Sequence, residues 1–208
     1  QSLLLGADWA LGDARANATA RLDDSHQFGR RSTANASFGY RLSPTLRGTV
    51  NIGTSFKAPT FNDLYYPGYA NPNLKPEHGR SLDAGLLWSS VGSKLGATIY
   101  QNRVTDLIVF VCDESYNCAP QNVANARLRG LTLTGGTRIA GIAIDASLDL
   151  ADAKNATTDM LLPRRAKRRG AIKFSGDVLN VNAGIEIAAS GNRFDNASNS
   201  LALPGYAV

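Results

Sequence analysis

The chain has 208 residues and a formal net charge of +5, and its hydrophobic content of 43% is ordinary for a soluble protein. Its longest apolar run, residues 107–111, is far too short for a transmembrane helix. Much of the basic excess lies in residues 163–169 without interleaved aromatic residues or a known binding module, so we expect no nucleic-acid partner.

Apolar and polar side chains alternate with a period of two along several segments. The alternation is clear in residues 45–56, 141–151 and 181–187, and it is typical of strands with one polar and one apolar face. Many of these runs reach about ten residues or more, which is the span of a tilted membrane strand and exceeds the usual globular strand. The pattern predicts an all-β protein with roughly 11 strands.

The predicted connections alternate between short turns and long loops. Short turns are expected near Gly12, at Ser43-Pro44, in residues 89–93, near Gly141 and near Gly176-Asp177. Long loops are expected in residues 24–31, 57–77, 106–121, 152–163 and 190–203. All long loops then lie at one end of an antiparallel sheet, as in outer-membrane β-barrels. A soluble β-sandwich with strands of about five or six residues is the structural alternative.

Aromatic residues favour the membrane interpretation. Trp9, Tyr40 and Trp88 lie within a few residues of short turns, whereas Phe56 and Phe110 lie next to long loops. Membrane proteins concentrate aromatic side chains in two such bands, one at each interface. These positions therefore predict two aromatic bands at opposite strand ends.

The two cysteines, Cys112 and Cys118, flank the polar sequence D-E-S-Y-N. No histidine cluster accompanies them to complete a zinc site, and five intervening residues do not fit a thioredoxin-type redox pair. A loop disulfide in an oxidising compartment is the simplest interpretation, and two free thiols in a cytosolic protein are the alternative.

The loop predicted in residues 57–77 combines prolines with aromatic residues. Its four prolines fix φ and remove backbone donors, so we expect no helix or central strand to run through it. Phe61, Tyr65, Tyr66 and Tyr69 place aromatic surface on the loop, which suits ligand recognition on a β scaffold. An ordinary rigid turn is the alternative.

Several motifs resemble those of a known family. Residues 53–59 read G-T-S-F-K-A-P and are followed by N-D-L-Y and N-P-N-L-K-P-E, which together resemble the signature of TonB-dependent outer-membrane receptors. T-D-L-I at residues 105–108 and N-V-A-N-A-R-L-R-G-L at residues 122–131 continue the match. The sequences D-L-A-D-A-K-N-A-T-T-D, from Asp149, and L-L-P-R-R-A-K, up to Lys167, are similar to the cobalamin receptor branch. The resemblance covers most of the chain from about residue 23 onward.

The resemblance implies an antiparallel transmembrane β-barrel in the bacterial outer membrane. Family barrels have 22 strands and a plugged lumen, so residues 1–208 correspond to about half of a barrel domain. The family's plug, TonB box and terminal strand have no counterpart here, and we expect a C-terminal barrel fragment. The resemblance implies TonB-coupled import of cobalamin without cofactor, metal or covalent chemistry, with TonB acting through the missing amino-terminal part.

Other functions remain open at this stage. A receptor for ferric siderophores or haem shares the motif in residues 54–77. A passive outer-membrane pore and a soluble β-rich binding module are alternatives from other classes. An enzyme is not expected, because the only histidines, His26 and His78, lie at loop edges and no nucleophile elbow is present.

The family resemblance also selects the candidate site residues. Ligand contacts are expected from the loop residues Phe61, Asn62, Tyr65, Tyr66, Tyr69 and Asn71, and from Arg164 and its neighbour Arg165. Phosphates of lipopolysaccharide in the outer leaflet are expected to contact Lys167, Arg168 and Arg169. For this basic run, ligand contact and simple solvation are the alternatives.

Overall fold

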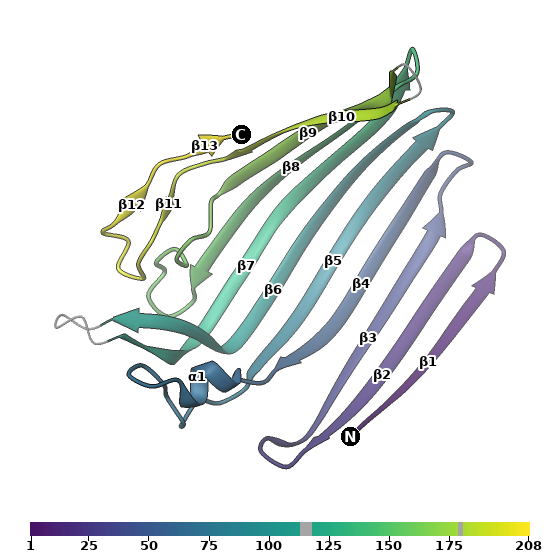
Figure 1. The fold of residues 1–208 in the computed structure, drawn as a ribbon. Helices are drawn as coiled ribbons and strands as arrows, with labels where there is room; N and C mark the ends of the chain where they lie inside the picture. The colour runs from purple at the N-terminus through teal and green to yellow at the C-terminus, as the bar shows by residue number, and fades with distance from the viewer. Residues whose placement is uncertain (113–117, 179–180) are drawn as a thin grey trace.

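A computed structural model describes residues 1–112, 118–178 and 181–208. The chain forms one antiparallel sheet of 11 strands, in the order β1-β2-β3-β4-β5-β6-β7-β8-β9-β10-β13, and a small sheet of β11 and β12 (Figure 1). The strands are β1 Ser2–Leu11, β2 Ala14–Ser25, β3 Gly29–Arg41, β4 Leu46–Lys57, β5 Glu77–Ser90, β6 Ser93–Cys112, β7 Cys118–Ile139, β8 Ile142–Asn155, β9 Arg168–Val178, β10 Val181–Ser190, β11 Arg193–Phe194, β12 Ala202–Leu203 and β13 Tyr206–Ala207. The large sheet therefore confirms the predicted all-β class and strand number.

Each strand from β1 to β10 pairs with its neighbours in the chain, so the sheet is an antiparallel meander. These ten strands are 10 to 22 residues long, which exceeds the usual globular strand and excludes the β-sandwich alternative. The sheet curves into an open half-barrel, with β1 at one edge and β13 at the other (Figure 1). No helix in the described ranges has the length and apolar character needed to cross a membrane.

The two faces of the sheet differ in chemistry. One register row of the apolar face runs across five strands through Val50, Ala84, Ile99, Leu131 and Leu150. Its side chains have no layer packed over them, and Ile99 remains 62% exposed. An uncovered apolar face of this extent matches the lipid-facing surface of a barrel, and the polar face then lines the lumen.

The aromatic band next to the short turns is confirmed. Trp9, Tyr40 and Trp88 share the apolar face, since each lies in register with apolar-face positions of the neighbouring strand. Phe110 does not belong to the opposite band, because its ring packs against Tyr69 of a loop. Loop packing has therefore replaced the expected membrane contact at that position.

Two predicted connections are wrong in extent. Strands β2 and β3 continue through most of residues 24–31 to the pair Ser25–Gly29, which leaves three residues between them. Strands β6 and β7 likewise continue through much of residues 106–121 to the pair Cys112–Cys118. Residues 24–31 are mostly polar and residues 107–111 are continuously apolar, so neither segment shows the alternation that marks a strand. Backbone ladder bonds form there nonetheless, because they do not depend on the side chains. The short turn predicted near Gly176-Asp177 follows just after these residues, since β9 ends at Val178, which pairs with Val181 of β10.

A hydrogen-bonded cluster on the polar face connects β6 to β9. Asp149 accepts bonds from the Tyr100 hydroxyl at 3.2 Å and the Thr132 hydroxyl at 3.1 Å, and Arg169 approaches it at 2.8 Å. The expected lipopolysaccharide contact of Arg169 is therefore wrong, because this guanidinium faces the lumenal side and pairs with Asp149. The cluster compensates the charge of a partly buried carboxylate in the barrel wall.

Candidate ligand-binding loops

Residues 58–76, which we call the aromatic loop, contain a short helix that proline content did not predict. Helix α1 Phe61–Tyr65 lies between Pro59 and Pro67. Thr60 and Asp63 form a capping box, in which the Asp63 backbone donates to the Thr60 hydroxyl and the Thr60 backbone donates to the Asp63 carboxylate. The reciprocal bonds satisfy amide groups that a single helical turn leaves free, so the turn persists between two prolines.

The aromatic residues of this loop form two pairs. Tyr66 and Tyr69 stack with ring centroids 4.4 Å apart, and Phe110 from β6 meets Tyr69 edge to face at 5.5 Å. Phe61 and Tyr65 form a separate tilted pair at 5.1 Å. Burial and a hydrogen bond with Tyr66 raise the pKa of Tyr69, so its hydroxyl stays neutral at physiological pH. The surface offered to a ligand is therefore dominated by neutral aromatic rings.

Asparagine side chains attach the aromatic loop to the hairpin of β6 and β7. The Asn71 amide donates to the Pro120 carbonyl at 3.0 Å. Asn122 accepts from the Lys75 backbone at 2.8 Å and donates to the carbonyls of Lys75 and Asp106 at 2.9 and 2.6 Å. Because these bonds join three chain segments, the loop is held in one position against the hairpin.

Replacing Asn122 by alanine should release the aromatic loop while leaving the barrel intact. The change removes three hydrogen bonds, each with a net contribution of about 1 kcal/mol. We expect faster amide exchange within residues 58–76, measured by hydrogen–deuterium exchange, with the strands unchanged. Asn62→Ala is the matched control, since the Asn62 side chain is exposed and has no hydrogen-bond partner in the described part of the chain. Equal exchange in both variants would show that Asn122 does not hold the loop.

A buried carboxylate supports the base of the aromatic loop. Glu77 is 8% exposed, and its Oε1 lies 3.1 Å from Lys57 Nζ and accepts from the Ile108 backbone at 3.1 Å. The carboxylate therefore connects β4, β5 and β6 at the point where the loop leaves the sheet. This contact explains the acidic residue that ends the N-P-N-L-K-P-E sequence.

A second loop unit consists of residues 156–167 and residues 191–203. The Arg164 guanidinium binds Asp195 at 2.6 Å, and its backbone donates to the Phe194 carbonyl. Asn199 exchanges two hydrogen bonds with the Leu161 backbone. The two segments are therefore joined side by side at the loop end of β8 and β9 (Figure 1).

The structure separates the predicted ligand residues into different roles. Asn71 is occupied by contacts that hold the loop, whereas the side chains of Asn62 and Arg165 are exposed. Arg164 and Arg165 lie on the second loop unit, and the β6–β7 hairpin separates it in the sheet from the aromatic loop. Phe110 was missed as a site residue, although its place beside the disulfide-closed hairpin Cys112–Cys118 offered a signal.

Comparison with known proteins identifies the family. Residues 1–208 match the family described as TonB dependent receptor-like, beta-barrel. The chain is 30% identical over 213 residues to the vitamin B12 transporter BtuB of Photobacterium profundum, covering 100% of this chain and 35% of that relative. The chain thus spans about a third of the length of this relative.

Solved structures agree on the fold. The copper transporter OprC is similar with a TM-score of 0.77 and 19% identity, over 100% of this chain and 37% of that one. The siderophore receptor PirA from Acinetobacter baumannii is similar with a TM-score of 0.78 and 14% identity, over 99% of this chain and 38% of that one. The chain belongs to the TonB-dependent receptor β-barrel family, and it is part of the barrel of an outer-membrane protein from this family of receptors and transporters.

Proposed function

We propose that the full-length protein containing this chain is an outer-membrane receptor that binds cobalamin at its loops and imports it with TonB energy coupling. The observation that carries the proposal is the 30% identity to a vitamin B12 transporter along the whole chain. The structural neighbours named above support the fold only, because they are less than 25% identical and their names include different cargoes.

The chemistry of the aromatic loop supports this choice of ligand. Residues 58–74 contain no Lys or Arg, and the exposed rings of Phe61, Tyr65, Tyr66 and Tyr69 dominate the surface. Aromatic rings can pack against the large apolar faces of a corrinoid, and the free Asn62 amide can hydrogen-bond its peripheral amides. An anionic ferric siderophore would instead favour cationic side chains on the capture surface.

A ferric siderophore receptor is the second candidate. The observation in its favour is the second loop unit, where Arg165 is exposed and Arg164 keeps 74% of its side chain exposed beside Asp195. These two guanidinium groups could contact an anionic ligand that the aromatic loop does not favour. Competition between the two ligand classes separates the candidates.

In the proposed mechanism the described residues capture and position the ligand without covalent chemistry. The aromatic loop supplies contact surface, and the hairpin of β6 and β7 fixes its position through Asn71 and Asn122. Ligand release into the barrel is assigned to TonB-driven rearrangement of a plug, in parts of the receptor beyond this chain. The barrel wall contributes a rigid frame for the loops.

Uptake by living cells tests the proposed function. Cells that lack their own cobalamin receptor and produce the full-length protein should accumulate radiolabelled cyanocobalamin, and a protonophore or deletion of tonB should stop the accumulation. Accumulation that persists without TonB would favour a passive pore. An absence of accumulation despite folded receptor in the outer membrane would contradict the cobalamin assignment.

The two arginines of the second loop unit give a further prediction. If Arg164 only joins the loop segments through Asp195, Arg164→Ala should loosen residues 156–167 and reduce ligand affinity modestly, by about fivefold. Arg165→Ala should leave both the amide hydrogen exchange of residues 156–167 and the cyanocobalamin affinity unchanged. The Arg165 side chain is exposed and forms no hydrogen bond or ion pair with any residue that the structure describes. Equilibrium binding and hydrogen exchange check both variants. A large loss of affinity in Arg165→Ala alone would assign a direct ligand contact to that residue.

A further inference from the structure

The disulfide closes a part of the β6–β7 hairpin that extends past the neighbouring strands. The ladder between β5 and β6 ends at Thr105 of β6, and the ladder between β7 and β8 ends at Ala126 of β7. The ladder between β6 and β7 continues to the pair Cys112–Cys118, whose side chains form the disulfide. The extending part, which we call the disulfide ribbon, consists of residues 107–112 and 118–123.

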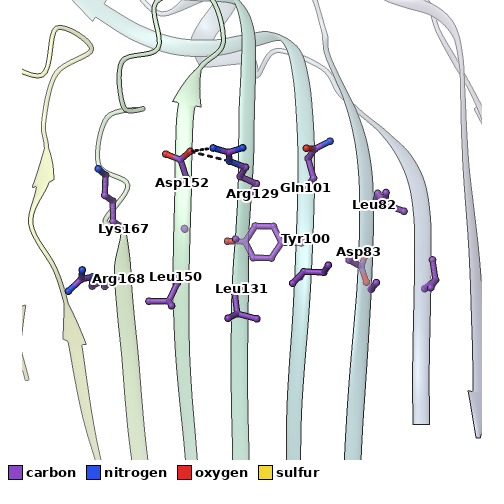
Figure 2. A pocket seen from close by; sticks show the side chains of 15 residues that line it. Leu82, Asp83, Tyr100, Gln101, Arg129, Leu131, Leu150, Asp152, Lys167 and Arg168 are labelled. Atoms are coloured by element: carbon purple, nitrogen blue, oxygen red, sulfur yellow. Dashed lines mark hydrogen bonds and ion pairs between the residues drawn. The ribbon is translucent and has the colours of Figure 1, made fainter. Parts of the chain in front are cut away.

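Within the barrel wall, in contrast, β6 and β7 each have a paired strand on both sides. Figure 2 shows this region, where Tyr100 of β6, Leu131 of β7 and Leu150 of β8 lie on adjacent strands. An ion pair at 3.2 Å between Arg129 and Asp152 further joins β7 to β8. Because a two-stranded hairpin by itself is only marginally stable in water, the disulfide ribbon depends on further contacts for its shape.

The base of the disulfide ribbon is attached to the wall. The Ile108 backbone donates to the Glu77 carboxylate at 3.1 Å, and Leu107 packs against a buried apolar cluster that includes Leu162. Asp106, just before the ribbon, has a φ of 56°, and the end of the hairpin bends away from the sheet (Figure 1). The tip of the ribbon therefore lies away from the contacts that hold its base.

The tip of the disulfide ribbon supports the aromatic loop. Phe110 packs edge to face on Tyr69 at 5.5 Å, and its register partner Pro120 accepts from the Asn71 amide at 3.0 Å. Both contacts come from one cross-strand pair, which lies two residues from the cysteines on each strand. Pro120 has no backbone N–H, so its strand has one potential ladder donor fewer at this point. The disulfide therefore closes the ribbon beside the pair on which the aromatic loop rests.

We propose that the Cys112–Cys118 disulfide positions the ligand-binding surface and makes ligand capture depend on the redox state of this one bond. A cross-link reduces the number of conformations open to a chain. Here it restricts the ribbon to the arrangement in which Phe110 and Pro120 meet the aromatic loop. The effect on ligand capture rests on the proposed cobalamin function, whereas the effect on the position of the aromatic loop does not.

Reduction of the disulfide removes this restriction. A dithiol reductant supplies two electrons and two protons, so the S–S bond breaks, both cysteines become thiols and the reductant becomes a cyclic disulfide. Cys112 is exposed, which gives a small dithiol access to the bond. If the reduced ribbon holds the loop in place for about a tenth of the time, the apparent ligand affinity falls about tenfold.

Hydrogen–deuterium exchange and cyanocobalamin binding, both measured on the full-length receptor in detergent, test the proposal. The oxidised receptor is compared with receptor that has been reduced by dithiothreitol and freed of reductant, and with the double variant Cys112→Ser and Cys118→Ser. Peptide mass spectrometry verifies the state of the two cysteines. The double variant treated with dithiothreitol is the matched control, because any further change there comes from another part of the receptor.

A chemical cross-link distinguishes positioning from direct ligand contact. Dibromomaleimide loses two bromides to the thiols of the reduced receptor and joins both sulfurs through two carbons. If the disulfide only positions the ribbon, this bridge should restore slow exchange and cyanocobalamin affinity. If the disulfide itself contacts the ligand, the added group should leave the affinity low although the exchange is slow again, and this outcome would overturn a purely positioning role.

We expect reduction and the double serine variant to accelerate exchange in residues 58–76 and to weaken cyanocobalamin binding about tenfold, with the wall strands unchanged. Unchanged exchange in residues 58–76 after verified reduction would overturn the proposal, and so would faster exchange throughout the barrel. Faster loop exchange with unchanged affinity would overturn the effect on ligand capture. If the oxidised receptor binds no cyanocobalamin, the proposed function fails, and the exchange comparison still decides whether the disulfide positions the loop.

Discussion

Replacing both Tyr66 and Tyr69 by alanine should weaken cyanocobalamin binding to the full-length receptor by about 100-fold. Their rings stack at 4.4 Å, and Phe110 packs on the edge of Tyr69. The double substitution removes both stacked rings and leaves Phe110 without its aromatic partner. A packed aromatic ring contributes about 1.4 kcal/mol beyond its buried area at the upper end of measured pairs, and two rings account for the expected factor. Equilibrium binding in detergent measures the loss.

Two control variants separate ring stacking from other effects. The double variant Tyr66→Phe and Tyr69→Phe keeps both rings and should retain affinity within about threefold, since only hydroxyl hydrogen bonds are lost. Phe61→Ala alters the separate pair with Tyr65 and reports whether that pair also contacts the ligand. Unchanged affinity in the double alanine variant would remove the stacked pair from the binding site.

Gly130→Ala should be the most damaging small substitution in the barrel wall. A Cβ on Gly130 would contact the Leu150 carbonyl oxygen and would lie 2.6 Å from the Tyr100 hydroxyl. Tyr100 is the register partner of Gly130, and its hydroxyl bonds Asp149, so the ring covers the glycine while it holds the carboxylate. Because backbone and ring must both shift, we expect a cost of about 2–3 kcal/mol.

The midpoint of urea unfolding in lipid vesicles measures this cost. Gly48→Ala is the matched control, because a Cβ there would meet Leu42 and Leu86 side chains at ordinary contact distances of 3.5 and 3.8 Å. Tyr100→Ala combined with Gly130→Ala should recover part of the loss by opening the space that the methyl group needs. Equal midpoints for Gly130→Ala and Gly48→Ala would contradict the close packing of Tyr100 on Gly130.

The strands were predictable from sequence because lipid and lumen impose opposite chemistry on alternate residues. That alternation in residues 45–56 and 141–151 indicated β4 and β8 directly. The alternation is lost toward the loops, where residues 24–31 are mostly polar on both faces of the strand and residues 107–111 are apolar on both. The continuation of β2 to Ser25 and of β6 to Cys112 therefore escaped prediction.

The candidate site was predictable in composition but not in arrangement. Local sequence indicated the aromatic loop, but the stack of Tyr69 with Phe110 joins residues that are far apart in the chain. The roles of Asn71 and Asn122 likewise depend on partners in another hairpin, so an amide that suggested ligand binding holds the loop instead. Strand parity would have placed Arg169 toward Asp149, had the start of β9 been known.

Equilibrium binding of cyanocobalamin to the detergent-purified full-length receptor, with a ferric catecholate siderophore as competitor, tests the central claim most directly. The aromatic surface of residues 58–74, which has no Lys or Arg, predicts tight cyanocobalamin binding that excess siderophore does not displace. A tight siderophore complex without cyanocobalamin binding would contradict the cobalamin assignment while leaving the receptor family intact.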